Sequence, residues 1–395
     1  MEEKIIYDFD AVISREGTFA EKYEARERFF GSAAVEPFWV ADMDLPTPAF
    51  LVDHLRERLA HPMFGYTEQY NAVFDAIVWW MKNQHGATVD PKWISLSSSV
   101  VTSISIAIQS LTEPGDSVIV LSPVYGPFFS CTQANGRNVA DCPLRIEQGR
   151  FEIDFAALEK TMAQADVKLL MLCNPHNPGG RVWSPSELAQ LAHLCATNGV
   201  ILFSDEIHCD IVYPPHRHNS MLNIAEASGN CIVAHSIGKT FNTSGLQASF
   251  SIIPDAALRK RFRAGLERVH AGDVNLLGKV ALAAALSPEG ADYKRQLVDY
   301  LGENTRLVCE KLQALEGVDV MAPEATFLVW SDFRKHGAWP EVFKRLIHNA
   351  DVALSGGTFF GPAGEGWFRI NCAHPRSKLL PAVDRIVAEF QNKPH

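Results

Sequence analysis

The stretch "KLLMLCNPHNPGGRVWSPSELAQLAHLCATNGVILFSDE", Lys168 to Glu206, contains two apolar runs separated by a helix-like segment. Each apolar run is short and is followed by turn or polar residues, which is typical of a buried strand. Between the runs, Ser184 and Pro185 favour a helix start, and Gly199 favours its end. A strand, a helix and a second strand in this order predict two neighbouring parallel strands in an α/β fold.

The same alternation extends through the middle of the chain. Three further apolar runs are predicted as strands: "SVIVLSP" (117–123), "CIVAHS" (231–236) and "ASFSIIP" (248–254). They predict a large domain at residues 46–285, built on a mainly parallel sheet covered by helices on both faces. The C-terminal part mixes a long amphipathic helix, short strands and a final helix. It predicts a smaller α+β domain formed by residues 1–45 and 286–395.

Composition limits the possible functions. The chain has 395 residues, which suits two domains, and a net charge of −10 from 36 Lys and Arg against 46 Asp and Glu. A nucleic-acid binder would carry a basic face, so no nucleic-acid partner is expected. The apolar runs are too short to span a bilayer, so no membrane partner is expected either. Eight scattered cysteines and a charged beginning, "MEEKIIYDFD", predict reduced thiols and a cytoplasmic protein without a bound metal.

The stretch "AHSIGKTFNTSG", Ala234 to Gly245, contains Gly238-Lys239-Thr240, which could end a nucleotide-binding phosphate loop. That loop needs a glycine six positions before its lysine, where this chain has Val233. The spacing therefore excludes a phosphate loop. Two alternatives remain, a solvated surface lysine and a lysine that holds a cofactor covalently.

Polar and aromatic side chains follow several predicted strands. They are Tyr125, Asn174, Asn177, Asp205, and Ser236 followed by Lys239. Each has an ordinary structural explanation, such as a turn, a helix cap or a packed ring. However, ligands bind at the carboxyl ends of the strands in a parallel α/β sheet, where all these residues would meet.

A serine-rich turn, Ser97 to Ser99, precedes an amphipathic helix. As helix-cap residues these serines are unremarkable, but the free N–H groups near Val100 and Val101 would also bind a phosphate group. A phosphate site, a ring, an amide, a carboxylate and a lysine together fit a flat, phosphorylated, cationic aromatic cofactor. Pyridoxal phosphate has these properties, since it needs a lysine for covalent attachment and an acid beside its pyridine nitrogen.

Segments over nearly the whole chain resemble fold-type I pyridoxal-phosphate enzymes of the class I/II aminotransferase superfamily. They include "FWVADMDLPTP", "LCNPHNPGGRVW", "SDEIHCDIV", "SIGKTFNTSGL" and "WFRINCAHPRSKL". Within that superfamily the chain resembles the MalY/PatB-type cystathionine β-lyase group. The resemblance implies an aspartate-aminotransferase-like large domain with a seven-stranded type of sheet. It also implies a homodimer with shared active sites and a small amino-acid substrate.

The resemblance also implies residue roles. Lys239 would hold the cofactor, Asp205 would pair with its pyridine nitrogen, and Tyr125 would stack on its ring, these three being the expected catalytic residues. Asn177 would bind the phenolic oxygen, and His208 stands where many aminotransferases have a tyrosine. The phosphate group would be held by Val100, Val101 and Ser236, with Tyr66 reaching it from a neighbouring subunit. Arg369 would bind the substrate carboxylate, with Asp42 and Asn177 also contacting the substrate.

Two positions depart from the wider superfamily. Gly179 replaces the threonine of the "NPTG" motif, and Gln247 replaces the phosphate-binding arginine of classical aminotransferases. The lyase group lacks that arginine too, so Gln247 fits the lyase interpretation.

The resemblance implies a carbon–sulfur β-lyase that converts L-cystathionine or other cysteine S-conjugates to pyruvate, ammonia and a thiol. An aminotransferase would use the same residues and remains an alternative. A non-enzymatic alternative is a regulator that binds a transcription factor.

Overall fold

The computed structural model describes residues 5–68, 70–227 and 229–391, and its largest sheet has seven strands in the order β2-β10-β9-β8-β7-β3-β4. Their bounds are β2 Ile94–Ser97, β3 Ser117–Val120, β4 Asn138–Asp141, β7 Val167–Cys173, β8 Ile201–Asp205, β9 Cys231–Ser236 and β10 Ser249–Ile252. All neighbouring pairs are parallel except those of β10, which runs antiparallel to β2 and β9. The predicted α/β class and the mainly parallel seven-stranded sheet are confirmed.

The strand–helix–strand unit predicted from Lys168 to Glu206 forms β7, α8 (Pro185–Thr197) and β8. The Ser184 side chain accepts a hydrogen bond from Glu187 N, and the Glu187 carboxylate accepts one from Ser184 N. This reciprocal pair satisfies two N–H groups at the helix start and fixes where the helix begins.

Successive side chains of β7 enter different hydrophobic clusters on the two faces of the sheet. Leu169 and Met171 pack with α5 (Val100–Leu111), α6 (Pro127–Ala134) and α9 (Ala256–Arg268). Leu170 and Leu172 pack with α7 (Phe155–Met162) and α8. Near β2 and β10, a third cluster adds α3 (Ala49–Ala60), α4 (Asn71–His85), α10 (Leu276–Ala285) and α11 (Pro288–Gln313). Burial on both faces explains why the strands are continuously apolar.

Two strands of this sheet were not predicted. β4 is the edge strand "NVAD" and has no buried residue, and the end of β2 was predicted as a serine-rich turn. In the structure Ser97 ends β2, and its hydroxyl lies 2.8 Å from the Ser103 hydroxyl and 2.7 Å from that of Ser249. Ser251 of β10 also donates to Ser103. Because these buried hydroxyls satisfy one another, serines can occupy strand positions where apolar residues would be expected.

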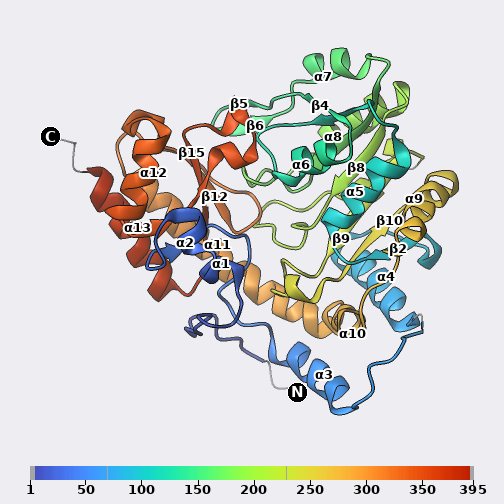
Figure 1. Ribbon diagram of the computed structural model, residues 1–395, viewed down its shortest axis with the longest axis horizontal. Coiled ribbons are helices and arrows are strands. Elements are labelled where there is room, and N and C mark those ends of the chain that lie inside the picture. The colour runs from blue at the N-terminus through green and yellow to red at the C-terminus, as the bar shows by residue number, and fades with distance from the viewer. Residues whose placement is uncertain (1–4, 69, 228, 392–395) are drawn as a thin grey trace.

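The C-terminal part forms a second sheet, β11 (Asp319–Met321), β12 (Leu328–Asp332), β15 (Trp367–Asn371) and β14 (Ser355–Gly356), with α12 (Trp339–His348) and α13 (Arg376–Gln391). The N-terminal helices α1 (Glu21–Glu24) and α2 (Arg26–Phe30) lie beside these elements, so blue and red segments meet in Figure 1. β1 (Glu36–Pro37) pairs in parallel with β13 (Val352–Ala353), and β5 (Arg145–Glu147) with β6 (Arg150–Glu152) forms a separate hairpin. The pairing of β1 with β13 agrees with an N-terminal contribution to the smaller domain, whose boundaries remain predictions. None of the helices in the described ranges is long and apolar enough to cross a membrane.

Candidate active site

A cavity of about 200 Å³ opens where β7, β8 and β9 end. Its lining includes eight of the residues predicted for the site: Val100, Val101, Tyr125, Asn177, Asp205, His208, Ser236 and Lys239. The order of the strands brings these residues together, although 139 positions separate Val100 from Lys239.

Lys239 lies in the turn after β9. Its Nζ donates a 2.6 Å hydrogen bond to the Ala41 carbonyl. Burial lowers the pKa of Lys239 to about 8, and the neighbouring Arg369 charge acts in the same direction. A fraction of this lysine is therefore neutral at physiological pH, as a nucleophile or a base requires.

Asp205 ends β8 with a buried side chain that accepts a hydrogen bond from Ile207 N at 3.1 Å. Burial raises the pKa of this carboxyl to about 6, against the opposing effects of that hydrogen bond and of Lys239. A buried carboxylate is stabilised by an adjacent cation, so Asp205 is suited to pair with a protonated ring nitrogen.

The N-terminus of α5 also lines the cavity. Ser99 caps the helix by accepting a 3.0 Å hydrogen bond from Thr102 N. The N–H groups of Val100 and Val101 fall in the first turn, where a helix provides no internal acceptor. Beside them, Ser98, Ser99, Ser236 and Ser244 supply hydroxyl groups to the lining. Such a helix start holds a phosphate group without a basic side chain, which accommodates Gln247 in place of arginine.

The rings of Tyr125 and His208 also line the cavity. Burial and the Asp205 charge raise the pKa of Tyr125 to about 12, so the phenol stays neutral. Burial and the charges of Lys239 and Arg369 hold the pKa of His208 well below its usual range. His208 Nδ1 is buried without a hydrogen-bond partner in the described structure. Both rings are therefore uncharged surfaces for a flat ligand.

Arg369, on β15, lies behind Asn177 and donates to its Oδ1 at 3.0 Å. It also donates to the Trp39 carbonyl at 2.8 Å, and burial lowers its pKa to about 10. The buried Arg369 Nε has no hydrogen-bond partner among the described residues. A buried guanidinium with a free N–H is a fitting receptor for a substrate carboxylate.

Four of the residues that the sequence places near the site do not line this cavity. Arg369 is bonded to the lining residue Asn177, and the Asn174 Nδ2 donates to the Asn219 carbonyl at 2.9 Å. The other two are Asp42 and Tyr66. The Asp42 carboxylate does not line the cavity and instead accepts hydrogen bonds of 3.1 and 2.7 Å from Arg15. Tyr66 is fully exposed at 112% and lies outside the cavity lining. A role for Tyr66 at this kind of site would require a second copy of the chain.

Of residues 39–44, Ala41 lines the cavity, whereas only Asp42 of this segment was predicted for the site. The carbonyl groups of this segment accept hydrogen bonds from Lys239 at Ala41, from Arg369 at Trp39, and from Asn371 at Val40 and Asp42. Every residue has a backbone carbonyl, so the residue type does not show whether that carbonyl accepts a functional hydrogen bond. The other lining residues that were not predicted for the site are Ser98, Ser99, Cys173, Ile207, Ser244 and Ala248. Of these, Ser98 and Ser99 were predicted as helix-cap residues and Cys173 as a reduced thiol.

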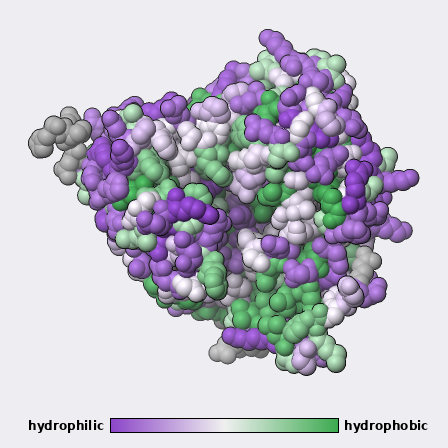
Figure 2. Space-filling model, viewed as in Figure 1, coloured by the Kyte–Doolittle hydropathy of each residue, from purple (hydrophilic) through white to green (hydrophobic). Residues whose placement is uncertain are grey.

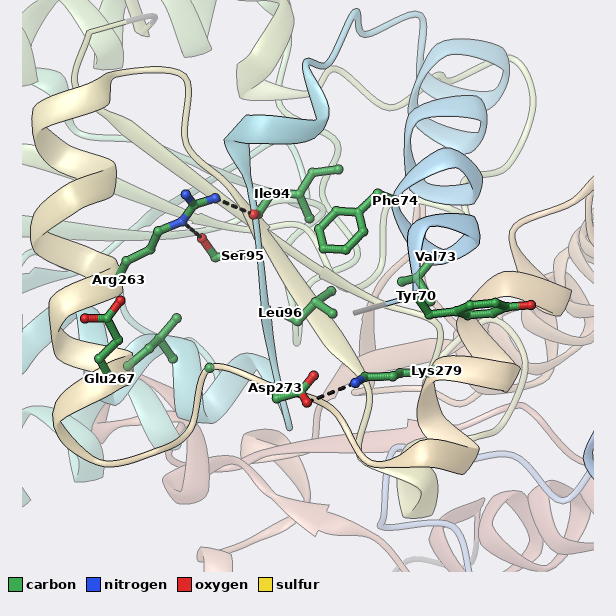
Figure 3. Close-up of a pocket in the computed structure, with 12 residues that line it drawn as sticks. Tyr70, Val73, Phe74, Ile94, Ser95, Leu96, Arg263, Glu267, Asp273 and Lys279 are labelled. Carbon is green, nitrogen blue, oxygen red and sulfur yellow. Dashed lines mark hydrogen bonds and ion pairs between the residues drawn. The ribbon is translucent and has the colours of Figure 1, made fainter. Parts of the chain in front are cut away.

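A larger cavity of about 360 Å³ lies between α4, β2, α9 and α10 (Figure 3). Its lining contains none of the predicted site residues. Three of its four charged side chains are already engaged, since Lys279 pairs with Asp273 at 2.9 Å and Arg263 donates to Ser95 and to the Ile94 carbonyl. The cavity at the ends of β7, β8 and β9 is therefore the better candidate for the active site, because eight of the predicted residues line it.

The residues of that cavity fit pyridoxal phosphate. Lys239 can hold the cofactor, Asp205 can face its ring nitrogen, and the start of α5 can hold its phosphate group. The free Nε of Arg369 leaves a place for the carboxylate of an amino acid. This fold and this site together define a pyridoxal-phosphate enzyme of fold type I.

Comparison with known proteins supports the same class. The family model "Aminotransferase class I and II" matches residues 43–386. Cystathionine beta-lyase PatB of Bacillus subtilis is 39% identical over 384 residues, 96% of this chain and 99% of that protein. Protein MalY of Escherichia coli is 31% identical, covering 97% and 98% of the two chains. The structure of cystalysin from Treponema denticola, which contains pyridoxal 5'-phosphate, matches with a TM-score of 0.94 at 30% identity, over 98% and 99% of the two chains.

A PLP-bound C-S lyase from Staphylococcus hominis matches with a TM-score of 0.90 at 31% identity, over 98% of this chain and 99% of that one. The chain belongs to the aminotransferase class I and II family.

Proposed function

We propose that the chain is a pyridoxal-phosphate-dependent carbon–sulfur β-lyase. It cleaves L-cystathionine or another cysteine S-conjugate to pyruvate, ammonia and a thiol. One observation carries this proposal. Lys239, Asp205 and the start of α5 line one cavity, in a chain that aligns over 96% of its length with a cystathionine beta-lyase.

The bound cofactor supplies an electron sink that makes the substrate Cα proton acidic and allows a leaving group on Cβ to depart. Lys239 would hold the cofactor, and its amine, with a pKa of about 8, would be able to take the Cα proton at neutral pH. Asp205 holds the ring nitrogen protonated. Arg369 binds the substrate carboxylate and so orients the Cα–H bond toward Lys239. The sulfur leaves with the electron pair of the broken C–S bond.

The test uses purified, cofactor-loaded protein with L-cystathionine and no added keto acid. Pyruvate and free thiol should both accumulate over many turnovers, in equal amounts. Aminotransferases require a keto acid to complete their cycle. A single turnover that resumes only after addition of a keto acid would therefore contradict the lyase proposal and favour the aminotransferase.

A regulatory role remains a prediction, tested by whether regulation survives in a Lys239→Ala variant. The expected cytoplasmic location also remains a prediction, which cell fractionation would test.

Cofactor capture should follow the ionisation of Lys239. Only the neutral amine attacks the cofactor aldehyde, and an amine is neutral above its pKa. With a pKa of about 8, the capture rate of the apoprotein should rise about tenfold per pH unit below about pH 8 and then level off. Stopped-flow absorbance from about pH 6 to about pH 10 measures this rate. An unperturbed lysine would give a rise that continues to about pH 10, which would contradict the role of burial.

We also propose a homodimer with shared active sites. Exposed apolar side chains lie at the end of α3 and after it, namely Leu59, Met63, Phe64, Tyr66 and Tyr70. Figure 2 shows hydrophobic surface in the lower part of this face, over α3 and α10. A second copy that covers this surface could bring its Tyr66 to the phosphate end of the cavity.

The dimer predicts subunit complementation. A Lys239→Ala chain and a Tyr66→Ala chain should each have low activity. In a mixed dimer, one site receives Lys239 from one subunit and Tyr66 from the other, and is intact. Random reassociation makes about half of the dimers mixed, and one of the two sites in each mixed dimer is intact. About a quarter of wild-type activity should therefore be restored. Activity after mixing and the sedimentation mass are the measurements. A monomeric mass, or no recovery in mixed dimers, would contradict the shared site.

A further inference from the structure

Behind the cavity, the carboxylate of Asp210 joins four segments of the chain. Its Oδ1 accepts hydrogen bonds from Trp80 Nε1 at 3.0 Å and from His85 Nε2 at 2.8 Å, both on α4. Its Oδ2 accepts a bond from Thr240 Oγ1 at 2.8 Å and lies 3.6 Å from His235 Nε2 on β9. Asp210 itself follows β8, so the carboxylate connects α4, β8, β9 and the turn after β9.

The hydrogen bonds account for a charge in this buried position. Burial disfavours the ionised form, but His235 and His85 hold the pKa of the Asp210 carboxyl well below its usual range. Burial lowers the pKa of His85 to about 4, so its ring is a neutral donor. Three donors within 3.0 Å fix the position and orientation of this ionised carboxylate. The Asp210 carboxylate is therefore a rigid anchor for the segments that carry the donors.

The anchor reaches the cavity through adjacent residues. Thr240 directly follows Lys239, so its bond to Asp210 fixes one side of the lysine backbone. On the other side, Gly238 N donates to Ser236 Oγ at 3.0 Å. His208, which lines the cavity, lies two residues before Asp210 in the same loop. Three lining residues are thus within two sequence positions of Asp210 or of one of its neighbours, His235 and Thr240. They are His208, Ser236 and Lys239.

We propose that Asp210 is a positioning residue that sets the orientation of Lys239 through Thr240. It touches neither substrate nor cofactor. This inference rests on the proposed role of Lys239 in holding the cofactor, and it adds a residue outside the cavity to the machinery of that reaction.

The same cluster offers a different chemistry that the test must separate. The ligand atoms of His85, Cys209, Asp210 and His235 all lie within 4.8 Å of one another. Two histidines, a cysteine and an aspartate are a donor set that zinc accepts. The hydrogen bonds favour the anchor, because Asp210 is already bonded to Trp80, His85 and Thr240.

The experiment compares Thr240→Val with Thr240→Ser and Thr243→Val in the cofactor-loaded enzyme. Valine keeps the shape of threonine but removes the hydroxyl that Asp210 binds, and serine restores it. Thr243 is the matched control, since it is buried in the same turn and its hydroxyl donates to the Ile237 carbonyl at 3.2 Å, within the turn itself. The readouts are kcat, KM, the melting temperature, zinc content and the pH midpoint of the cofactor's visible absorbance.

Thr240→Val should lower kcat about tenfold with KM nearly unchanged, and should shift the absorbance midpoint by about half a pH unit or more. Thr240→Ser and Thr243→Val should keep the wild-type midpoint and kcat within about twofold. If Thr240→Val and Thr243→Val lose only melting temperature, and to the same extent, Asp210 merely stabilises the fold and the proposal is overturned. One equivalent of zinc in the purified wild-type protein would replace the anchor with a metal centre and would also overturn it.

The absorbance titration needs only a bound cofactor, so it separates this proposal from the lyase proposal. A wild-type enzyme that titrates normally but releases no pyruvate contradicts the lyase activity alone. A wild-type protein that forms no visible band contradicts both.

Discussion

Replacement of Lys239 by alanine should lower kcat for the elimination by about 10⁴-fold or more. The change removes both the covalent hold on the cofactor and the amine that takes the Cα proton. No other lysine lines the cavity, so the neighbouring residues offer no substitute amine. Pyruvate release from L-cystathionine measures the effect.

A matched readout separates lost chemistry from lost folding. The Lys239→Ala protein should melt near the temperature of the wild-type apoprotein, because the Lys239 side chain loses only its hydrogen bond to the Ala41 carbonyl among the described residues. A small primary amine added to the assay should restore part of the activity, since it replaces the missing amine. Retention of more than about one hundredth of wild-type kcat would contradict the assignment of Lys239 as the base.

Replacement of Asp205 by asparagine should lower kcat/KM about 10²- to 10³-fold. The two side chains have nearly the same shape, so the change removes the charge that holds the ring nitrogen protonated. The wild-type carboxyl, with its pKa raised to about 6 by burial, is mostly ionised at pH 7 and becomes neutral as the pH falls through about 6. Wild-type apoprotein should therefore lose affinity for the cofactor below about pH 6, whereas the asparagine variant should lack this transition.

Glu206→Gln provides the control for Asp205→Asn. Glu206 is the adjacent buried carboxylate, but it pairs with His218 at 2.8 Å and does not line the cavity. Glu206→Gln should lower the melting temperature and leave kcat/KM within about threefold of wild type. Equal losses of activity in the two variants would mean that buried charge near β8 supports folding only, and would contradict the assigned role of Asp205.

The central fold was predictable because its signals are local. Each buried strand of the parallel sheet is a short apolar run, and Ser184, Pro185 and Gly199 mark the ends of a helix between two of them. Chemistry-bearing residues at strand ends then come together through the topology of a parallel sheet, as Tyr125, Asp205 and Lys239 do.

What the sequence did not reveal depends on contacts between distant residues. β2 was missed because Ser97 is satisfied by Ser249, 152 positions away. The contribution of Ala41 is a carbonyl group, which every residue possesses. The four segments that meet at Asp210 carry no common motif, and each of their polar residues would pass as an isolated core or turn residue.

The backbone of residues 39–44 has a consequence for the timing of biosynthesis. Its carbonyl groups accept hydrogen bonds from Arg369 and Asn371, which the ribosome adds about 330 residues later. Since synthesis runs from the N-terminus, residues 39–44 cannot form these hydrogen bonds until Arg369 and Asn371 have been made. Only then is the Ala41 carbonyl held at Lys239. Nascent chains arrested before β15 should therefore fail to retain pyridoxal phosphate, while released chains should retain it. Maturation of the enzyme would then begin only after β15 has been synthesised.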